Sequence, residues 1–190
     1  ELGQGQPIVM LHGIFGSSDN WLTQSKILSE KYRTFALDLR NHGQSPHDEA
    51  FDYNVMVEDV VDFINSKQLT DAVVIGHSMG GKVAMNLALA HPDKLSKLIV
   101  VDIAPKEYDM SDYIYTKALN AISIDSIATR QEADEALSEF VPEPDVRQFL
   151  LKNLQRKAEG GFNWKLNLPS ITANILNIGR AVQSKGTFDK

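Results

Sequence analysis

The 190-residue sequence contains no cysteine, which excludes disulfide bonds and thiolate metal sites but says little about the compartment. It also has no run of apolar residues long enough to cross a bilayer, so it predicts no membrane-spanning helix. No signal peptide is apparent in the sequence. We therefore expect a cytoplasmic protein with no membrane partner.

Positive charge is also scarce. Lysine and arginine total 19 against 25 aspartates and glutamates, which gives a net charge of −6. Neither this balance nor any cluster of basic residues indicates a nucleic-acid partner. The chain is 43% hydrophobic and 23% charged, as is usual for a globular protein with a real core. Its length suggests one domain, or one domain with an insertion.

The most informative stretch is Val73–Gly81, which reads as a buried strand, a sharp turn and the start of a helix. Its G-H-S-M-G segment matches the G-x-S-x-G pattern of a nucleophile elbow. In that context Ser78 is expected at the tip of the turn, in a strained backbone conformation that exposes its hydroxyl. Gly76 and Gly80 flank it because strand and helix approach too closely there for side chains. The N–H of Met79, at the helix start, could face a developing negative charge.

Apolar runs and helical periodicity alternate before Pro105. Strands are expected over 7–12, 32–39, 72–75 and 98–101, and helices over 21–30, 54–67 and 82–90. Short apolar strands that alternate with helices indicate a mostly parallel sheet with helices on both faces. His12, Asp38, Ser78 and Asp102 lie at the carboxyl ends of these strands, so they converge on the rim where such sheets bind ligands.

After Pro105 the pattern becomes helical. Helices are expected over 108–128, 129–140, 145–158 and 169–180, and Gly160-Gly161 is expected to end the third. No sheet strand is clear in this part. We interpret 1–105 as the core, 106–180 as a helical cap over the strand-end rim, and 181–190 as the start of a return to the core. The alternative is an ordinary helical half of a larger fold.

Three motifs occur in the order found in the α/β-hydrolase superfamily, and the sequence resembles that superfamily through them. H-G-I-F-G-S at 12–17 resembles its H-G-x-x-G-S oxyanion loop, and D-L-R-N-H-G-Q-S at 38–45 resembles its D-x-R-G-x-G-x-S loop. The elbow is the third. Asn41 stands where glycine is usual, and the turn is expected to survive because asparagine tolerates left-handed backbone. With G-H-S-M-G-G-K and V-D-I-A-P, the set is most similar to small bacterial YbfF-type esterases and their mitochondrial relatives.

The elbow and the resemblance imply roles for the residues near the rim. Ser78 would be the nucleophile, and the N–H groups of Met79 and Ile14 would form the oxyanion hole, with Phe15 as the alternative to Ile14. Phe15 and His77 would line the substrate pocket, and His77 would point away from the Ser78 hydroxyl.

Two further rim residues are expected to be structural. His12 precedes the oxyanion glycine and would brace that loop, since the triad order of this fold places the base last. Asp38 would tie down its own Arg40–Ser45 loop.

The resemblance to YbfF-type esterases also implies that Asp102 is the acid of the triad. A carboxylate at this rim can hold an imidazole in the right tautomer and stabilise its cation. The alternatives are a strand-end aspartate that accepts hydrogen bonds from loop N–H groups, and an acid after a later strand, where the wider superfamily usually has it.

A triad in the order Ser…Asp…His requires a histidine after Asp102, but the last histidine is His91. At roughly 30 residues per strand–helix unit, about 60 more residues would complete the fold. We therefore expect the fold to be C-terminally incomplete, the catalytic histidine to lie beyond Lys190, and these 190 residues alone to be essentially inactive. His42 and His47 are expected in loops and His91 at a solvated helix end. The five histidines lack metal-ligand spacing, so no metal and no cofactor are expected.

We expect the full-length protein to be a serine esterase or thioesterase that hydrolyses a small acyl ester or thioester through an acyl-enzyme on Ser78. A cofactor-free haloperoxidase, a C–C-bond hydrolase and a non-catalytic ligand-binding protein are the alternatives on this scaffold. Dehalogenases and epoxide hydrolases are disfavoured because they resemble this pattern with Asp in place of Ser78. The sequence favours no particular oligomeric state.

Overall fold

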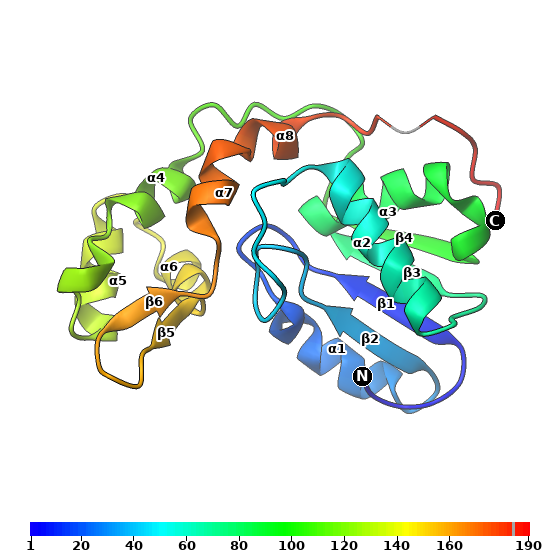
Figure 1. Cartoon of the computed structure of the whole chain (residues 1–190), viewed down its shortest axis with the longest axis horizontal. Helices are drawn as coiled ribbons and strands as arrows, with labels where there is room; N and C mark the ends of the chain where they lie inside the picture. The colour runs from blue at the N-terminus through cyan, green and yellow to red at the C-terminus, as the bar shows by residue number, and fades with distance from the viewer. Residues whose placement is uncertain (184) are drawn as a thin grey trace.

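The computed structural model describes residues 1–183 and 185–190 (Figure 1). Its main sheet is parallel throughout and has the strand order β2-β1-β3-β4. The strands are β1 (Pro7–Leu11), β2 (Arg33–Leu37), β3 (Val73–His77) and β4 (Lys97–Val101). The predicted parallel sheet is confirmed, and all four of its strands lie where apolar runs indicated them.

Alternate residues of β1 face two different layers. The helices before residue 105 are η1 (Ser18–Trp21), α1 (Leu22–Leu28), α2 (Tyr53–Ser66), α3 (Met79–Ala90) and η2 (Pro92–Lys94). Val9 and Leu11 belong to the main core together with buried residues of α2 and α3. Ile8 and Met10 point the other way and pack toward Trp21 and Leu28, on the α1 side. The period of two in β1 thus places helices on both faces, as predicted.

The rest of the chain forms a second group of elements, on the side of the sheet toward which its strands point (Figure 1). These are α4 (Ile114–Ala121), η3 (Ile124–Ser126), α5 (Arg130–Ser138), α6 (Pro144–Leu151), β5 (Leu154–Arg156), β6 (Phe162–Trp164), α7 (Leu168–Ala173) and α8 (Ile175–Gly179). Among the described residues, no helix combines the length and the apolar character that a bilayer crossing needs.

The predicted helix over 145–158, and the prediction of no strand after Pro105, are wrong. α6 ends at Leu151, and β5 pairs with β6 in an antiparallel hairpin. Gly160 and Gly161, with φ of 97° and 74°, form the hairpin turn and do not end a helix. Leu154 fits the helical period and is only 3% exposed, but it is buried as the first residue of strand β5 and not as part of a helix. Burial alone therefore did not distinguish the two conformations.

The helix predicted over 108–128 is also too long. Only 114–121 is α-helical, and tertiary contacts hold the start of the preceding segment outside the helix. The N–H of Tyr108 donates to Gly179 O at 2.8 Å, and its hydroxyl accepts from the Ala104 N–H at 3.1 Å. The Lys82 ammonium lies 4.8 Å from the centre of the Tyr108 ring. These contacts dock the start of this segment on α8 and α3.

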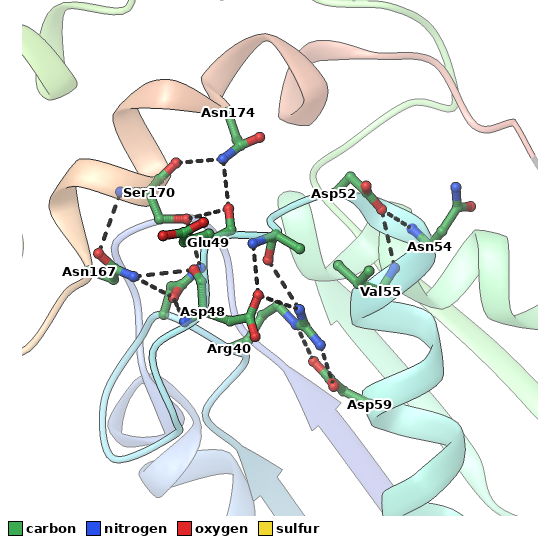
Figure 2. A network of polar contacts seen from close by, with 12 residues as sticks. Arg40, Asp48, Glu49, Asp52, Asn54, Val55, Asp59, Asn167, Ser170 and Asn174 are labelled. Atoms are coloured by element: carbon green, nitrogen blue, oxygen red, sulfur yellow. Dashed lines mark hydrogen bonds and ion pairs between the residues drawn. The ribbon is translucent and has the colours of Figure 1, made fainter.

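The loop after β2 holds the chain where it returns to the core. Asn41 is left-handed as expected, with φ of 67°, and it is completely buried. Its carbonyl oxygen accepts from the Asn167 N–H at 3.0 Å, and its side chain bonds Asn167 Nδ2, Ser170 Oγ and the Asp48 N–H. Figure 2 shows Asn167, Ser170 and Asn174 against the backbone of Asp48 and Glu49. A glycine at 41 would keep the turn but lose three of these bonds.

Candidate active site

Ser78 occupies the turn between β3 and α3. Its backbone has φ of 51° and ψ of −119°, a combination that costs free energy for any residue with a side chain. A Cβ added at Gly76 would overlap the Gly80 carbonyl oxygen, and one added at Gly80 would lie 2.6 Å from His12 O. Strand and helix therefore meet with no room for side chains, for the reason that the motif indicated.

Backbone contacts join Ser78 to the ends of two other strands. Its N–H donates to Val101 O at the end of β4, at 3.0 Å, and the N–H of Gly80 donates to His12 O just after β1, at 3.1 Å. A Cβ at Gly13 would lie only 3.1 Å from the Ser78 Cβ. The loop after β1 thus passes directly beside the serine.

In this loop, residues 13–16, the N–H of Phe15 has a hydrogen-bond acceptor, whereas the N–H of Ile14 has none recorded among the described residues. Phe15 has a left-handed φ of 60°, and its N–H donates to His42 Nε2 at 3.2 Å. Among the described residues, no hydrogen-bond acceptor is recorded for the Ile14 N–H. Met79 is the first residue of α3, so its N–H has no acceptor within the helix. Within the part of the chain that the structure describes, Ile14 and Met79 are thus two backbone donors near Ser78 with no recorded acceptor.

Two buried histidines brace the loops on either side of this site. His12 Nδ1 lies 2.8 Å from Gly13 O and its Nε2 accepts from the Leu39 N–H at 3.0 Å. His42 Nδ1 lies 2.9 Å from Arg40 O while its Nε2 accepts from Phe15. Each ring therefore carries its proton on Nδ1. Burial lowers the pKa of His12 and lowers that of His42 to about 3, so both rings stay neutral.

We expect these histidines to make the protein acid-sensitive. Unfolded histidine titrates near pH 6.5, so between that value and about 3 the unfolded state binds the proton that folded His42 refuses. The contribution of His42 to the free energy of unfolding is therefore fully present above pH 6.5 and is lost as the pH drops toward 3. For His42 alone the loss is on the order of 2 kcal/mol between pH 7.5 and 5. Urea unfolding of wild type and His42→Asn at several pH values measures it.

The His42→Asn variant is expected to be less stable than wild type at pH 7.5 and to lose less stability on acidification. His12→Asn should behave in the same way, since burial lowers the pKa of His12 as well. The interval stays above the titration range of ordinary carboxylates, so aspartates contribute little to it. Stability curves that run parallel for wild type and both variants would contradict the assignment.

Asp38 holds two loops together. Its Oδ1 accepts from the Ser18 N–H at 2.6 Å and its Oδ2 from the Gln44 N–H at 2.8 Å. Burial works against the charged form, but the hydrogen bonds from Ser18 and Gln44 outweigh it and lower the pKa of the carboxyl. With both oxygens so engaged, Asp38 has the contacts of a structural carboxylate.

Asp102 follows β4 directly and is far more open. Its φ is 55°, and its side chain is 89% exposed. In the β3–β4 register His77 pairs with Val101, so Ser78 and Asp102 come next on adjacent strands. His77 Nε2 lies 3.9 Å from Asp102 Oδ2, and its side chain is 45% exposed. The structure therefore brings Asp102, His77 and Ser78 to one rim.

The other histidines have partners elsewhere. His47 Nε2 lies 3.1 Å from Lys165 O, and His91 Nε2 lies 3.4 Å from Glu58 Oε1. For the part of the chain that the structure describes, no hydrogen bond joins any histidine to the Ser78 hydroxyl. Within the same residues, no group of three or more His, Asp or Glu could hold a metal ion.

Sequence reasoning missed three residues of this region. Tyr113 stacks on Phe15, with ring centroids 6.1 Å apart and planes 13° apart, and burial raises the pKa of Tyr113 to about 12. Asn153 donates to Phe15 O at 2.8 Å. His42 Nε2 accepts a hydrogen bond from the Phe15 N–H. The motif placed His42 in a loop without its role, and no pattern in the sequence indicated the other two.

A cavity of about 510 Å³ lies away from Ser78. It lies beside β2 and the start of α2 and is lined by Asp38, Arg40, Asp59 and Phe63, among others. Arg40 is held there by Asp59, with Nε–Oδ2 and Nη2–Oδ1 distances of 2.6 and 2.8 Å (Figure 2). We take Ser78 as the candidate site because the strained turn and the loop after β1 meet there, and neither lines this cavity.

Comparison with known proteins identifies relatives that match most of the chain. The model of the family described as alpha/beta hydrolase fold matches residues 6–139. The Danio rerio protein named sn-1-specific diacylglycerol lipase ABHD11 is 37% identical over 184 residues, which are 93% of this chain and 58% of that protein. Esterase YbfF of Escherichia coli is 39% identical over 165 residues, which are 86% of this chain and 63% of that protein.

The solved structures agree with this relationship. A structure titled Marine microorganism esterase superposes with a TM-score of 0.93 at 41% identity, covering 99% of this chain and 74% of that one. E-2-(Acetamidomethylene)succinate hydrolase, at 22% identity and a TM-score of 0.77, shares the fold. The chain spans about three fifths of the length of the two curated relatives.

Proposed function

Because the chain belongs to the alpha/beta hydrolase fold family, we propose that the natural protein is a serine esterase or thioesterase with Ser78 as its nucleophile. The observation that carries this proposal is the strained Ser78 turn, flanked by the N–H groups of Ile14 and Met79, for which the described residues supply no recorded acceptor. The names of the relatives, esterase and diacylglycerol lipase, point the same way. In this reaction Ser78 Oγ attacks an acyl carbonyl, and water later resolves the acyl-enzyme.

The oxyanion of the tetrahedral intermediate would accept hydrogen bonds from Met79 and Ile14. Met79 lies at the N-terminus of α3, where the helix dipole adds to its donor strength. Of the two candidates in the loop after β1, Ile14 is supported over Phe15, since the Phe15 N–H already donates to His42. His42 and His12 would then act by holding this loop.

Asp102 is the proposed acid of the triad. It follows β4 on the strand next to Ser78, and it is exposed enough to accept a bond from an imidazole. His77 is fixed in β3 as its last residue, so it is not our candidate for the base. It is proposed to line the pocket with Phe15 and Tyr113. The base is proposed to be a histidine of the natural protein outside these 190 residues.

The proposed substrate is a small acyl ester or acyl thioester. The stacked rings of Phe15 and Tyr113 lie next to the loop after β1 and would offer an apolar wall to the acyl group. Tyr115 packs edge-on against Tyr113, with centroids 5.2 Å apart, and extends this wall. Cytoplasmic location stays a prediction.

A serine-directed fluorophosphonate tests the proposal. The natural protein should be labelled at Ser78, as located by mass spectrometry, and should hydrolyse p-nitrophenyl acetate and short acyl thioesters. A substrate panel with a long-chain diacylglycerol, a halide-dependent peroxidation and a C–C cleavage substrate separates the alternatives. Labelling without any turnover would favour a binding protein that retains the pocket, and no labelling at Ser78 would exclude the nucleophile.

A further inference from the structure

Asn153 links two parts of the chain that are far apart in sequence. It lies between α6 and β5 and is only 3% exposed. Its side-chain Nδ2 donates to Phe15 O at 2.8 Å, across 138 residues, and to Leu150 O at 3.1 Å. Its own carbonyl oxygen accepts from the Lys165 N–H at 2.8 Å, which fixes Asn153 to the β5–β6 hairpin.

Phe15 is contacted by residues from both halves of the chain. Its N–H is held by His42, from the loop after β2, and its carbonyl oxygen by Asn153, from the 106–180 segment. Its ring stacks on Tyr113 of the same segment. A left-handed phenylalanine is unfavourable unless its surroundings determine it, and here contacts on three sides do so.

We propose that Asn153 is a positioning residue for the oxyanion hole, an inference that rests on the proposed function. By holding Phe15 O, Asn153 fixes the peptide after Phe15, as His42 fixes the peptide before it. Together they keep the loop in the conformation that leaves the Ile14 N–H free beside Ser78. The 106–180 segment thereby supports transition-state stabilisation directly, in addition to covering the rim.

The bond requires a donor at this position. An amide provides Nδ2–H to the carbonyl oxygen, whereas the nearly isosteric carboxylate of Asn153→Asp would face that oxygen with a lone pair. Asn153→Ala removes the donor without adding charge. Removal of one oxyanion donor costs about 10²–10³ in kcat, and a displaced donor costs part of that. We expect Asn153→Ala to lower kcat by about 10- to 100-fold and Asn153→Asp by at least as much.

Asn167→Ala is the matched control. Asn167 is also an amide of the 106–180 segment that bonds the core, through Asn41 Oδ1 at 3.0 Å and Asp48 O at 3.2 Å, and it has no contact with Phe15. Both alanine variants should lower the unfolding temperature. Only Asn153→Ala should lower kcat when activity is measured well below that temperature.

The experiment compares kcat, KM and inhibition by a trifluoromethyl ketone in the natural protein and its variants. Such a ketone forms a tetrahedral oxyanion with serine, so its Ki should rise about as much as kcat/KM falls, while KM stays within about threefold. A raised KM with unchanged kcat, or equal loss of kcat in Asn167→Ala, would overturn the inference. If wild type neither hydrolyses esters nor reacts at Ser78, the proposed function itself fails, so the two failures are distinct.

Discussion

Replacement of Ser78 by alanine is expected to lower kcat for p-nitrophenyl acetate by at least about 10⁴-fold, because it removes the atom that forms the acyl-enzyme. What remains would be the attack of water on an ester held by the Met79 and Ile14 N–H groups. An alanine adopts the backbone conformation of this turn, with φ of 51°, at the same free-energy cost as a serine. The variant should therefore fold like wild type.

Ser78→Gly is the matched control for this prediction. Glycine adopts the Ser78 conformation without a side-chain clash, so this variant should be inactive and yet more stable, by about 1 kcal/mol. Its unfolding temperature and its kcat, measured side by side with those of Ser78→Ala, separate loss of the nucleophile from loss of the fold. Ester hydrolysis by Ser78→Ala at the wild-type rate would refute the nucleophile assignment.

The second large effect is expected for Asp102→Asn. The amide keeps the size of the side chain but favours the wrong histidine tautomer, and in a serine protease that change costs about 10⁴ in kcat. An esterase with further polar groups near its histidine loses less, so we predict at least about a 100-fold loss of kcat with little change in KM. Steady-state kinetics of the natural protein and the variant measure it.

Asp112→Asn provides a control with the same change of charge. The side chains of Asp102 and Asp112 are both 89% exposed, and Asp112 makes an ion pair with Lys117. Its replacement should leave kcat near the wild-type value. If Asp102→Asn folds normally and stays within about threefold of wild type, Asp102 is a structural residue and the acid lies elsewhere in the natural protein.

The sequence by itself determined the parts of this protein that depend on local constraints. The apolar runs of β1 to β4 and the glycines of the elbow act over a few residues, so their pattern predicted both the sheet and the turn at Ser78. Asn41 is of the same kind, because its left-handed φ of 67° follows from the turn it occupies. The local pattern was enough to predict where these features lie, although the strands pair only in the folded chain.

Only the tertiary structure decided the features that depend on distant partners. The end of α6 and the hairpin after it depend on the pairing of β5 with β6 and on the bond from Asn153 to Phe15 O, whereas the helical period there was equally compatible with a longer helix. Likewise, the motif indicated Ile14 as an oxyanion donor and left Phe15 as the alternative. Our proposal of Ile14 rests on a hydrogen bond from the Phe15 N–H to His42, 27 residues away. Such contacts exist only once the chain has folded, so no local pattern records them.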